Sequence, residues 1–277
     1  VADLTVDGSL ATGGAVCVML MRAGCNTWVA VLCAFAAGML AGLVTGLFHT
    51  ACGIPAILAG ILTQLALYSV NLRILGAGTG MGKANQAISV DKYQLLVSQR
   101  YVREASLANP LLLLLIITAV LIAVLYWFFG TELGCSLRAT GANQNMARAQ
   151  GINTNFNIVL GLMVSNGLVA LSGALLAQYQ GAADVSGGRG AIVIGLAAVI
   201  IGEVIFGKLF RNFALKLLAV SIGAILYYIV IQVVLRLGLS TDDLKLLTAL
   251  VVALFLALPY WKGRYFTKPK AAKGGAV

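Results

Sequence analysis

The chain has 277 residues, of which 60% are hydrophobic and only 10% charged, whereas a soluble domain carries about 25% charged residues. Its net charge is +10, from 19 Lys and Arg against nine Asp and Glu. The basic residues stand singly between apolar runs, with one cluster near the C-terminus. This distribution excludes nucleic acid as a partner and indicates a protein embedded in the lipid bilayer.

Eight apolar segments are long enough to cross or partly cross a bilayer, for which about 20 apolar residues are needed. In chain order they are Leu10–Arg22, Trp28–Phe48, Ile54–Leu75, Pro110–Gly130, Phe156–Gln178, Ala191–Phe206, Phe213–Leu235 and Leu244–Tyr260. The runs are apolar on all sides, so they are helices and not barrel strands, whose residues alternate. We predict an all-α, polytopic transmembrane bundle over residues 1–260, a basic tail at 261–277, and no β-sheet beyond a short hairpin.

Glycines recur inside the apolar segments. Gly38, Gly42 and Gly46 are spaced by four residues and share one face of the second segment. In lipid, such a ladder of small residues lets two helices approach closely. We therefore expect this face to be a helix-packing face.

The charges also predict how the chain lies in the membrane. The tail holds five Lys and Arg residues between Lys262 and Lys273, which predicts a cytoplasmic C-terminus. Counting back through the segments places residues 135–155 in the cytoplasm and residues 76–109 outside. The latter stretch carries four Lys and Arg residues, against the rule, and we expect it to fold as an external cap.

The sequence holds no catalytic or metal-binding constellation. Its five cysteines form no Cys-x-x-Cys pair, and His49 is the single histidine. The nucleotide-binding pattern Gly-x4-Gly-Lys-Ser/Thr is also absent. We therefore expect no bound metal or cofactor, and no enzymatic activity in this chain.

Glu203 is the one acidic residue inside an apolar segment. An ionisable residue at such a position marks a functional site by default. Lys208 and Arg211 follow closely and favour a structural ion pair. Roles in gating, subunit contact or proton coupling stay open as alternatives.

The polar stretch from residue 137 to 152 predicts a short helix over Asn143–Gln150. Asn143 is a good N-cap and Gly151 a good C-terminal stop. Gly141 and Gly151 would allow sharp turns at the two ends. Small residues on one face suit docking into a groove on another protein. The alternative is a helix lying on the membrane surface, but nothing bulkier than Met146 could enter lipid.

This stretch resembles a known signature. The stretch is similar to the coupling helix of bacterial ABC importer permeases of the branched-chain amino acid and monosaccharide type. The residues that carry the likeness are Arg138-Ala-Thr-Gly-Ala-Asn143, followed by Met146-Ala147 and Gly151-Ile152. Two further motifs resemble the same family in the same order, Asp3-Leu-Thr-Val-Asp7-Gly-Ser-Leu10 near the start and Gly195-Leu-Ala-Ala-Val-Ile-Ile-Gly-Glu203 later. The likeness covers nearly the whole chain.

The resemblance implies a permease of the bacterial inner membrane that forms a dimer, with a homodimer favoured. Its partners would be two cytoplasmic ABC ATPase subunits, which use the ATP, and an extracytoplasmic solute-binding protein. The ATPase-coupling residues would be Arg138, Ala139, Gly141, Asn143, Met146, Ala147, Arg148 and Gly151. The translocation path would include Asp7, Gly8 and Ser9 at a broken helix, together with Gln64 and Asn71 in the third segment.

Members of the family begin with a further helix before the Asp-Leu-Thr-Val-Asp-Gly motif, so we expect that helix to be missing from this chain. The motifs look most like a branch tied to amino acids, aromatic ones included. The alternative function is a secondary transporter driven by an ion gradient, which would need ionisable residues at mid-membrane. A membrane-embedded enzyme is a third possibility, against which the absence of paired acids and nucleophile–base sets counts.

Overall fold

The computed structural model describes residues 3–77, 80–89, 93, 95–97, 109–206 and 212–236, and singly 246, 249, 250, 253 and 257. Most of the predicted segment Leu244–Tyr260, and all of the tail at 261–277, lie outside these residues. The chain separates into two compact units, Val1–Ile192 and Val193–Val277.

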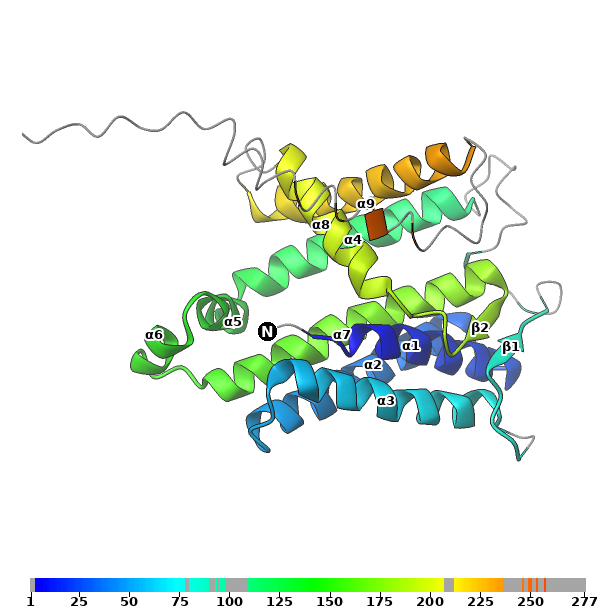
Figure 1. The fold of residues 1–277 in the computed structure, drawn as a ribbon, viewed down its shortest axis with the longest axis horizontal. Coiled ribbons are helices and arrows are strands. Elements are labelled where there is room, and N and C mark those ends of the chain that lie inside the picture. The colour runs from blue at the N-terminus through cyan, green and yellow to red at the C-terminus, as the bar shows by residue number, and fades with distance from the viewer. Residues whose placement is uncertain are drawn as a thin grey trace, which may run out of the picture. The chain divides into compact units, whose positions relative to one another are not determined.

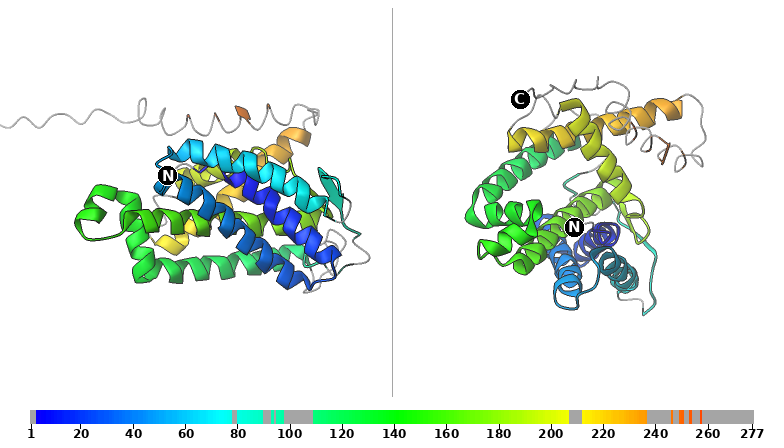
Figure 2. Two further views of the ribbon diagram at one scale, coloured as in Figure 1. Left: turned by 90° about the horizontal axis from the view of Figure 1, so that it is seen from below. Right: turned by 60° about the vertical axis from the view of Figure 1, so that its left-hand side comes forward.

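The first unit is an antiparallel helical bundle with a two-stranded sheet at one end (Figures 1 and 2). Its elements are α1 (Val6–Arg22), α2 (Thr27–Thr50), α3 (Ala56–Leu75), β1 (Asn85–Ala87), α4 (Pro110–Gly130), α5 (Glu132–Ala142), α6 (Gln144–Ala149), α7 (Thr154–Gln180) and β2 (Ala182–Asp184). Helix α8 (Ala191–Phe206) begins in the last residues of this unit. The α5–α6 turn and the β1–β2 sheet lie at opposite ends of the bundle (Figure 1).

Side-chain caps fix where several helices begin. Asn26, Asn109 and Asn153 each accept a hydrogen bond from a backbone amide in the first turn of α2, α4 and α7. Pro110 stands at the first position of α4, where its missing N–H costs nothing. Gly181, with a φ of 70°, ends α7 in the left-handed conformation.

Among the described residues, five helices are long and apolar enough to cross a membrane: α2, α3, α4, α7 and the Phe213–Val233 part of α9 (Phe213–Arg236). Helices α1 and α8, of 17 and 16 residues, are shorter. The seven described helices in the apolar segments match the prediction, and the all-α polytopic bundle is confirmed. The chain is an integral membrane protein.

Helix α7 packs against α1 and α2 at backbone distance. A Cβ added at Gly42 of α2 would collide with the backbone of Leu162, and one at Gly46 would lie 3.0 Å from the Cα of Val159. On α1, a Cβ at Gly13 would collide with the carbonyl of Ala170. Glycine alone permits this approach, so the predicted packing face is confirmed.

The sheet joins two distant parts of the chain. Strands β1 and β2 pair antiparallel, with Gln86 opposite Ala183. Backbone hydrogen bonds from Ile88 to Gly181 and from Val185 to Ala84 extend the pairing on both sides. The prediction allowed a short hairpin, but the strands are not neighbours in sequence. Their pairing holds part of the 76–109 stretch against the end of α7.

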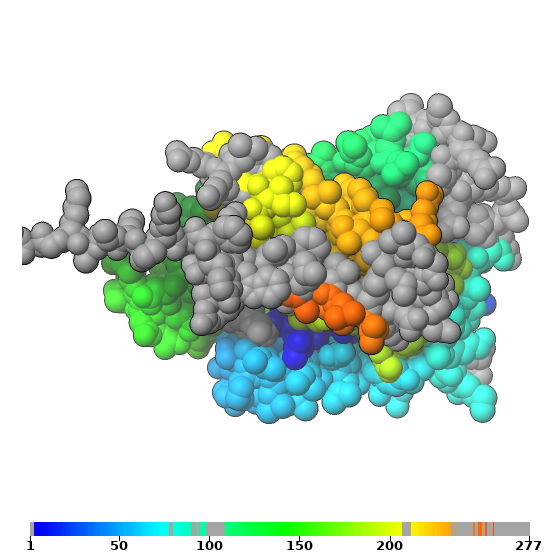
Figure 3. All heavy atoms as spheres, turned by 45° about the horizontal axis from the view of Figure 1, so that its top comes forward, coloured from blue at the N-terminus to red at the C-terminus, as the bar shows by residue number. Residues whose placement is uncertain are grey.

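Outward-facing apolar side chains cover much of the first unit's helices. In α4 only Pro110 is buried, and about half of the helix's residues are exposed, among them Leu111 and Leu115. The outer face of α3 is likewise uncovered (Figure 3, blue to cyan), with Leu58 49% exposed. Exposed Trp28 starts α2 near the β1–β2 end, and exposed Trp127 stands near the α5 end of α4. Aromatic residues at both ends of the apolar band are typical of the two membrane interfaces.

The second unit pairs α8 with α9. A Cβ at Gly202 of α8 would collide with the carbonyl of Ala219, and one at Gly223 of α9 with that of Ala198. The adjoining cluster contains Ile201 and the fully buried Tyr227. Small residues therefore set this helix contact as they do in the first unit.

The glycine contacts predict a specific loss of stability. Gly42→Ala should destabilise the protein by about 1–3 kcal/mol, because the methyl group forces α2 away from α7. Gly195→Ala in α8 is the matched control, since a Cβ there meets nothing within 4 Å. Thermal unfolding in detergent would measure both variants. Equal melting temperatures for the two would contradict the inferred contact.

Candidate functional site

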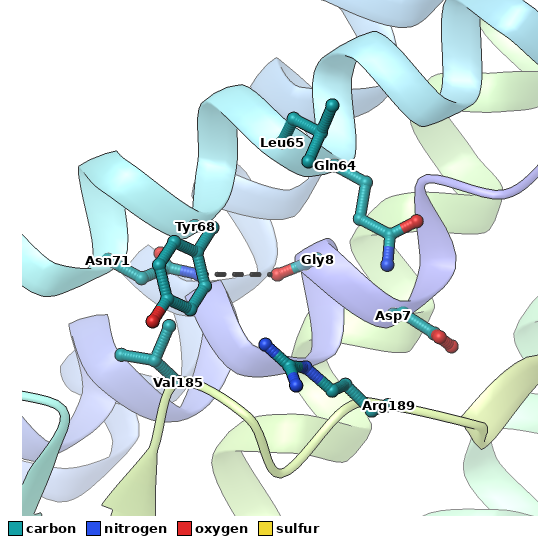
Figure 4. Close-up of a pocket in the computed structure, with 8 residues that line it drawn as sticks. All are labelled: Asp7, Gly8, Gln64, Leu65, Tyr68, Asn71, Val185 and Arg189. Atoms are coloured by element: carbon teal, nitrogen blue, oxygen red, sulfur yellow. Dashed lines mark hydrogen bonds between the residues drawn. The ribbon is translucent and has the colours of Figure 1, made fainter.

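A cavity of about 330 Å³ opens in the first unit (Figure 4). It is bounded by the start of α1, the middle of α3 and the segment that leads from β2 to α8. Its lining residues are Asp7, Gly8, Gln64, Leu65, Tyr68, Asn71, Val185 and Arg189. The volume lies at the lower end of the range for pockets that bind small molecules.

Helices α1 and α8 both begin beside this cavity, deep within the bundle. Gly8 packs against Gln64, near the middle of α3, and Ser9 bonds Asn166, near the middle of α7. The Asp7 carboxylate accepts hydrogen bonds from the backbone N–H groups of Gly190 and Ile192, at 3.0 and 3.2 Å. Asp7 of α1 therefore caps the first turn of α8. At a helix start, the backbone N–H groups lack partners within the helix, and together with the helix dipole they favour a negative charge.

Helix α3 contributes a polar stripe to the cavity. Gln64, Tyr68 and Asn71 are spaced by four and three residues and so share one face. Asn71 is 1% exposed, and its Nδ2 lies 3.5 Å from the carbonyl oxygen of Gly8, a long and weak contact. Within the part of the chain that is described, its Oδ1 is buried and has no hydrogen-bond partner. A buried acceptor left unpaired costs about 1–3 kcal/mol unless a ligand or water meets it.

Arg189 brings the cavity its positive charge. It precedes Gly190, whose φ of 89° needs glycine. Its guanidinium lies over the ring of Tyr68, 5.9 Å from the centroid, which is a cation–π contact (Figure 4). Among the described residues, no hydrogen bond or ion pair reaches the guanidinium, so its N–H donors are available.

The structure brings together four of the five residues predicted for a translocation path: Asp7, Gly8, Gln64 and Asn71. Ser9 lies elsewhere. Its hydroxyl donates to Oδ1 of Asn166 at 2.6 Å, and Nδ2 of Asn166 donates to Asp3. Ser9 therefore helps hold α1 to α7 and does not line the cavity.

Sequence reasoning missed Tyr68 and Arg189. The sequence could have indicated Tyr68, because its spacing places it on the same helix face as Gln64 and Asn71. Almost nothing in the sequence indicates Arg189, because it stands in a glycine-rich loop far from Asp7 in sequence.

A second candidate site lies at the far end of the first unit, where α5 and α6 meet. Asn143 is in an extended conformation between them and donates its N–H to the carbonyl of Ala139. Its side chain accepts from the amides of Asn145 and Met146, so it ends one helix and caps the next. A short helix at Gln144–Ala149 confirms the element predicted over Asn143–Gln150.

Hydrogen bonds fasten this region to α7. Arg148 donates through Nε to the hydroxyl of Thr154 at 2.8 Å, at the first residue of α7. One turn further, Asn157 is buried and donates to the hydroxyl of Thr140 in α5 at 3.0 Å. Gly151, with a φ of 79°, makes the predicted turn after α6. Helices α5 and α6 are therefore tied to the start of one long helix.

Three details of the prediction for this region need correction. Arg138, Ala139 and Gly141 belong to α5, an additional helix that the sequence reading did not predict. No turn occurs at Gly141, because α5 continues to Ala142 and the chain bends at Asn143 instead. Ala147 is 3% exposed and faces its own chain, whereas the neighbouring Met146 is 64% exposed.

Glu203 lies in the second unit and is exposed. It borders a hollow of about 250 Å³ together with Lys216 of α9. Lys208 and Arg211, the predicted ion-pair partners, lie outside the described residues. Among the residues that are described, no group of three or more His, Cys, Asp or Glu side chains could hold a metal ion.

Comparison with known proteins places the chain in a family. The family described as "Branched-chain amino acid transport system / permease component" matches residues 1–258. A tyrosine transport system permease protein of Clostridioides difficile (strain R20291) is 38% identical over 92% of this chain and 81% of its own length. An uncharacterised protein of Rickettsia prowazekii is 35% identical over 93% and 87%. The ribose import permease of Escherichia coli (strain K12) is 28% identical over 88% and 77%.

No solved structure matches the chain with significance. The family match covers most of the chain, and two of these three relatives are permeases of systems that transport small solutes. The chain belongs to the permease family of branched-chain amino acid transport systems and is a permease component of an ABC-type system for a small solute.

Proposed function

We propose that this chain forms the membrane pathway of an ATP-driven amino acid importer in a bacterial inner membrane, and that the α5–α6 region docks on a separate ATPase. The observation that carries the proposal is the pairing of two features on one bundle. A polar cavity lies where α1 and α8 begin, and an exposed short helix is bonded to the far end of α7.

The exposure of α6 supports the docking role. Every residue from Gln144 to Ala149 except Ala147 is exposed, and Met146 offers an apolar, adaptable side chain. The bond from Arg148 to Thr154 joins α6 directly to α7. A displacement of α6 by an ATPase would therefore move the long helix against which α1 and α2 pack.

The relatives and the cavity support an amino acid as the solute. The tyrosine permease is 38% identical to this chain, whereas the permeases for ribose and D-allose of Escherichia coli are 28% and 25% identical. The cavity combines the guanidinium of Arg189 with the aromatic ring of Tyr68. A neutral sugar does not need a charged partner, whereas an amino acid carries a carboxylate that an arginine can bind.

The remaining parts of the proposal follow the family. An importer of this type works with an extracytoplasmic solute-binding protein and a second permease, which we propose is another copy of this chain. The α5–α6 end would face the cytoplasm, together with the C-terminus. The β1–β2 end would face the binding protein.

Uptake measurements test the solute class. The permease, reconstituted in vesicles with the ATPase and solute-binding protein of its own system, should accumulate radiolabelled L-tyrosine when ATP is present. Uptake should stop when ATP is replaced by a non-hydrolysable analogue. D-ribose is the competing solute: ATP-dependent uptake of ribose without tyrosine would contradict the amino acid assignment and leave the importer assignment intact.

Substitution at Met146 tests the docking role. Met146→Glu should lower ATP-driven uptake on the order of tenfold or more, because a charged group replaces an apolar contact at the interface. Met146→Leu is the matched control and should keep most of the activity. Vesicle uptake and co-purification of the ATPase would be measured together. Normal uptake by the Glu variant would show that α6 is not the docking element.

A further inference from the structure

We infer that the cavity between α1, α3 and the 185–190 segment binds the carboxylate of an amino acid in transit, and that Arg189 is the residue that engages it. The inference rests on the proposed function, because it takes the solute to be an amino acid. Beyond the proposed function, the inference names the carboxylate as the group that is recognised and Arg189 as the side chain that binds it.

The first argument is that Arg189 has unused donors at the cavity wall. Its contact within the cavity is the face of Tyr68, which positions the guanidinium without using its N–H groups. A planar guanidinium presents N–H pairs that match the two oxygens of a carboxylate. An arginine already paired with an acid could not do this, but no such pair occurs in the described residues.

The second argument is that the nearby acid is already committed. Both oxygens of Asp7 accept backbone hydrogen bonds at the start of α8, from Gly190 and from Ile192. Its charge is therefore opposed by the positive end of a helix dipole as well as by these donors. The formal charges of Asp7 and Arg189 cancel, but the carboxylate is held by protein donors whereas the guanidinium is not, so the charge that can meet a solute is the positive one.

The third argument is that the same cavity holds an unmet acceptor. The Oδ1 of Asn71 is buried without a partner in the described residues, and Asn71 lines the cavity from α3. An ammonium group carries three donors and no acceptor. A zwitterion with its carboxylate on Arg189 would direct its ammonium group towards the polar α3 face formed by Gln64 and Asn71.

The first test measures the local charge without any partner protein. Gln64→Cys is introduced into a permease whose five native cysteines are replaced by serine, and labelling by anionic and cationic methanethiosulfonate reagents is timed. The anionic reagent should react faster. Arg189→Gln should lower the anionic-to-cationic rate ratio on the order of tenfold, as expected for removing a unit charge a few ångströms away.

Arg73→Gln is the matched control, because Arg73 is exposed in the last turn of α3 and does not line the cavity. It should leave the rate ratio unchanged. The inference would be overturned by an unchanged ratio in Arg189→Gln, or by a thiol at position 64 that neither reagent labels. Neither outcome depends on ATP-driven uptake.

The second test measures transport of L-tyrosine in the reconstituted vesicles. Arg189→Gln should reduce uptake on the order of tenfold to a hundredfold, the range for losing a hydrogen bond to a charged group. Arg189→Lys should retain an intermediate rate, because it keeps the charge and loses the planar pairing. Co-purification of the ATPase with each variant would show that the complex is assembled.

The outcomes of this test separate the inference from the proposed function. Normal tyrosine uptake by Arg189→Gln, beside an active wild type, would overturn the inference and leave the importer standing. If the wild type takes up ribose and not tyrosine, both the amino acid assignment and the inference fail. If tyrosine uptake falls only in the variants at Arg189 and not in Arg73→Gln, the inference is supported.

Discussion

The close approach of α7 to α1 and α2 is the constraint on which the first unit depends. At Gly13, Gly38 and Gly42 the backbones of neighbouring helices occupy the space where a side chain would begin. In lipid no hydrophobic effect drives helices together, so such contacts must come from dispersion and shape. The three helices therefore pack pairwise against one another as a three-helix core, and the other features of the unit are positioned relative to it.

Helix α7 runs from the exposed α6 to the β1–β2 sheet. At three positions along it, a buried amide side chain bonds a different neighbouring segment. Asn157 bonds Thr140 of α5, Asn166 bonds Ser9 of α1, and Gln178 accepts from the amide of Leu96. All three amides are buried, where a lost partner is costly. In the proposed importer these bonds make a continuous connection from the docking element to the residue next to Gly8 at the cavity wall.

The sequence predicts a structural feature well when residues close together in the chain cause it. The bounds of Pro110–Gly130 are predicted correctly, because an uninterrupted apolar run is itself what inserts into a membrane. Asn71 is recognisable as a polar residue in an apolar helix. Helix α5 is missed because Leu133 and Leu137 are the only large apolar residues between 132 and 142, too few to show a helical period, although Thr131 is a capping residue. The approach of Arg189 to Tyr68 and the pairing of β1 with β2 depend on contacts distant in sequence, which no local pattern reveals.

The positions at which α1 and α8 begin bear on the charge of the solute in the proposed importer. Irregular backbone at membrane depth is tolerated only where its polar groups are satisfied or face an aqueous cavity. Asp7 satisfies amides at the start of α8, and Asp3 accepts from the amide of Thr5 at the start of α1. Because these two acids are used to close the helix ends, they are not free to attract a cation. In the proposed importer, the polar groups left for a solute are those of Arg189 and the α3 stripe, so the contacts that satisfy the two helix starts also decide which charge the cavity can bind.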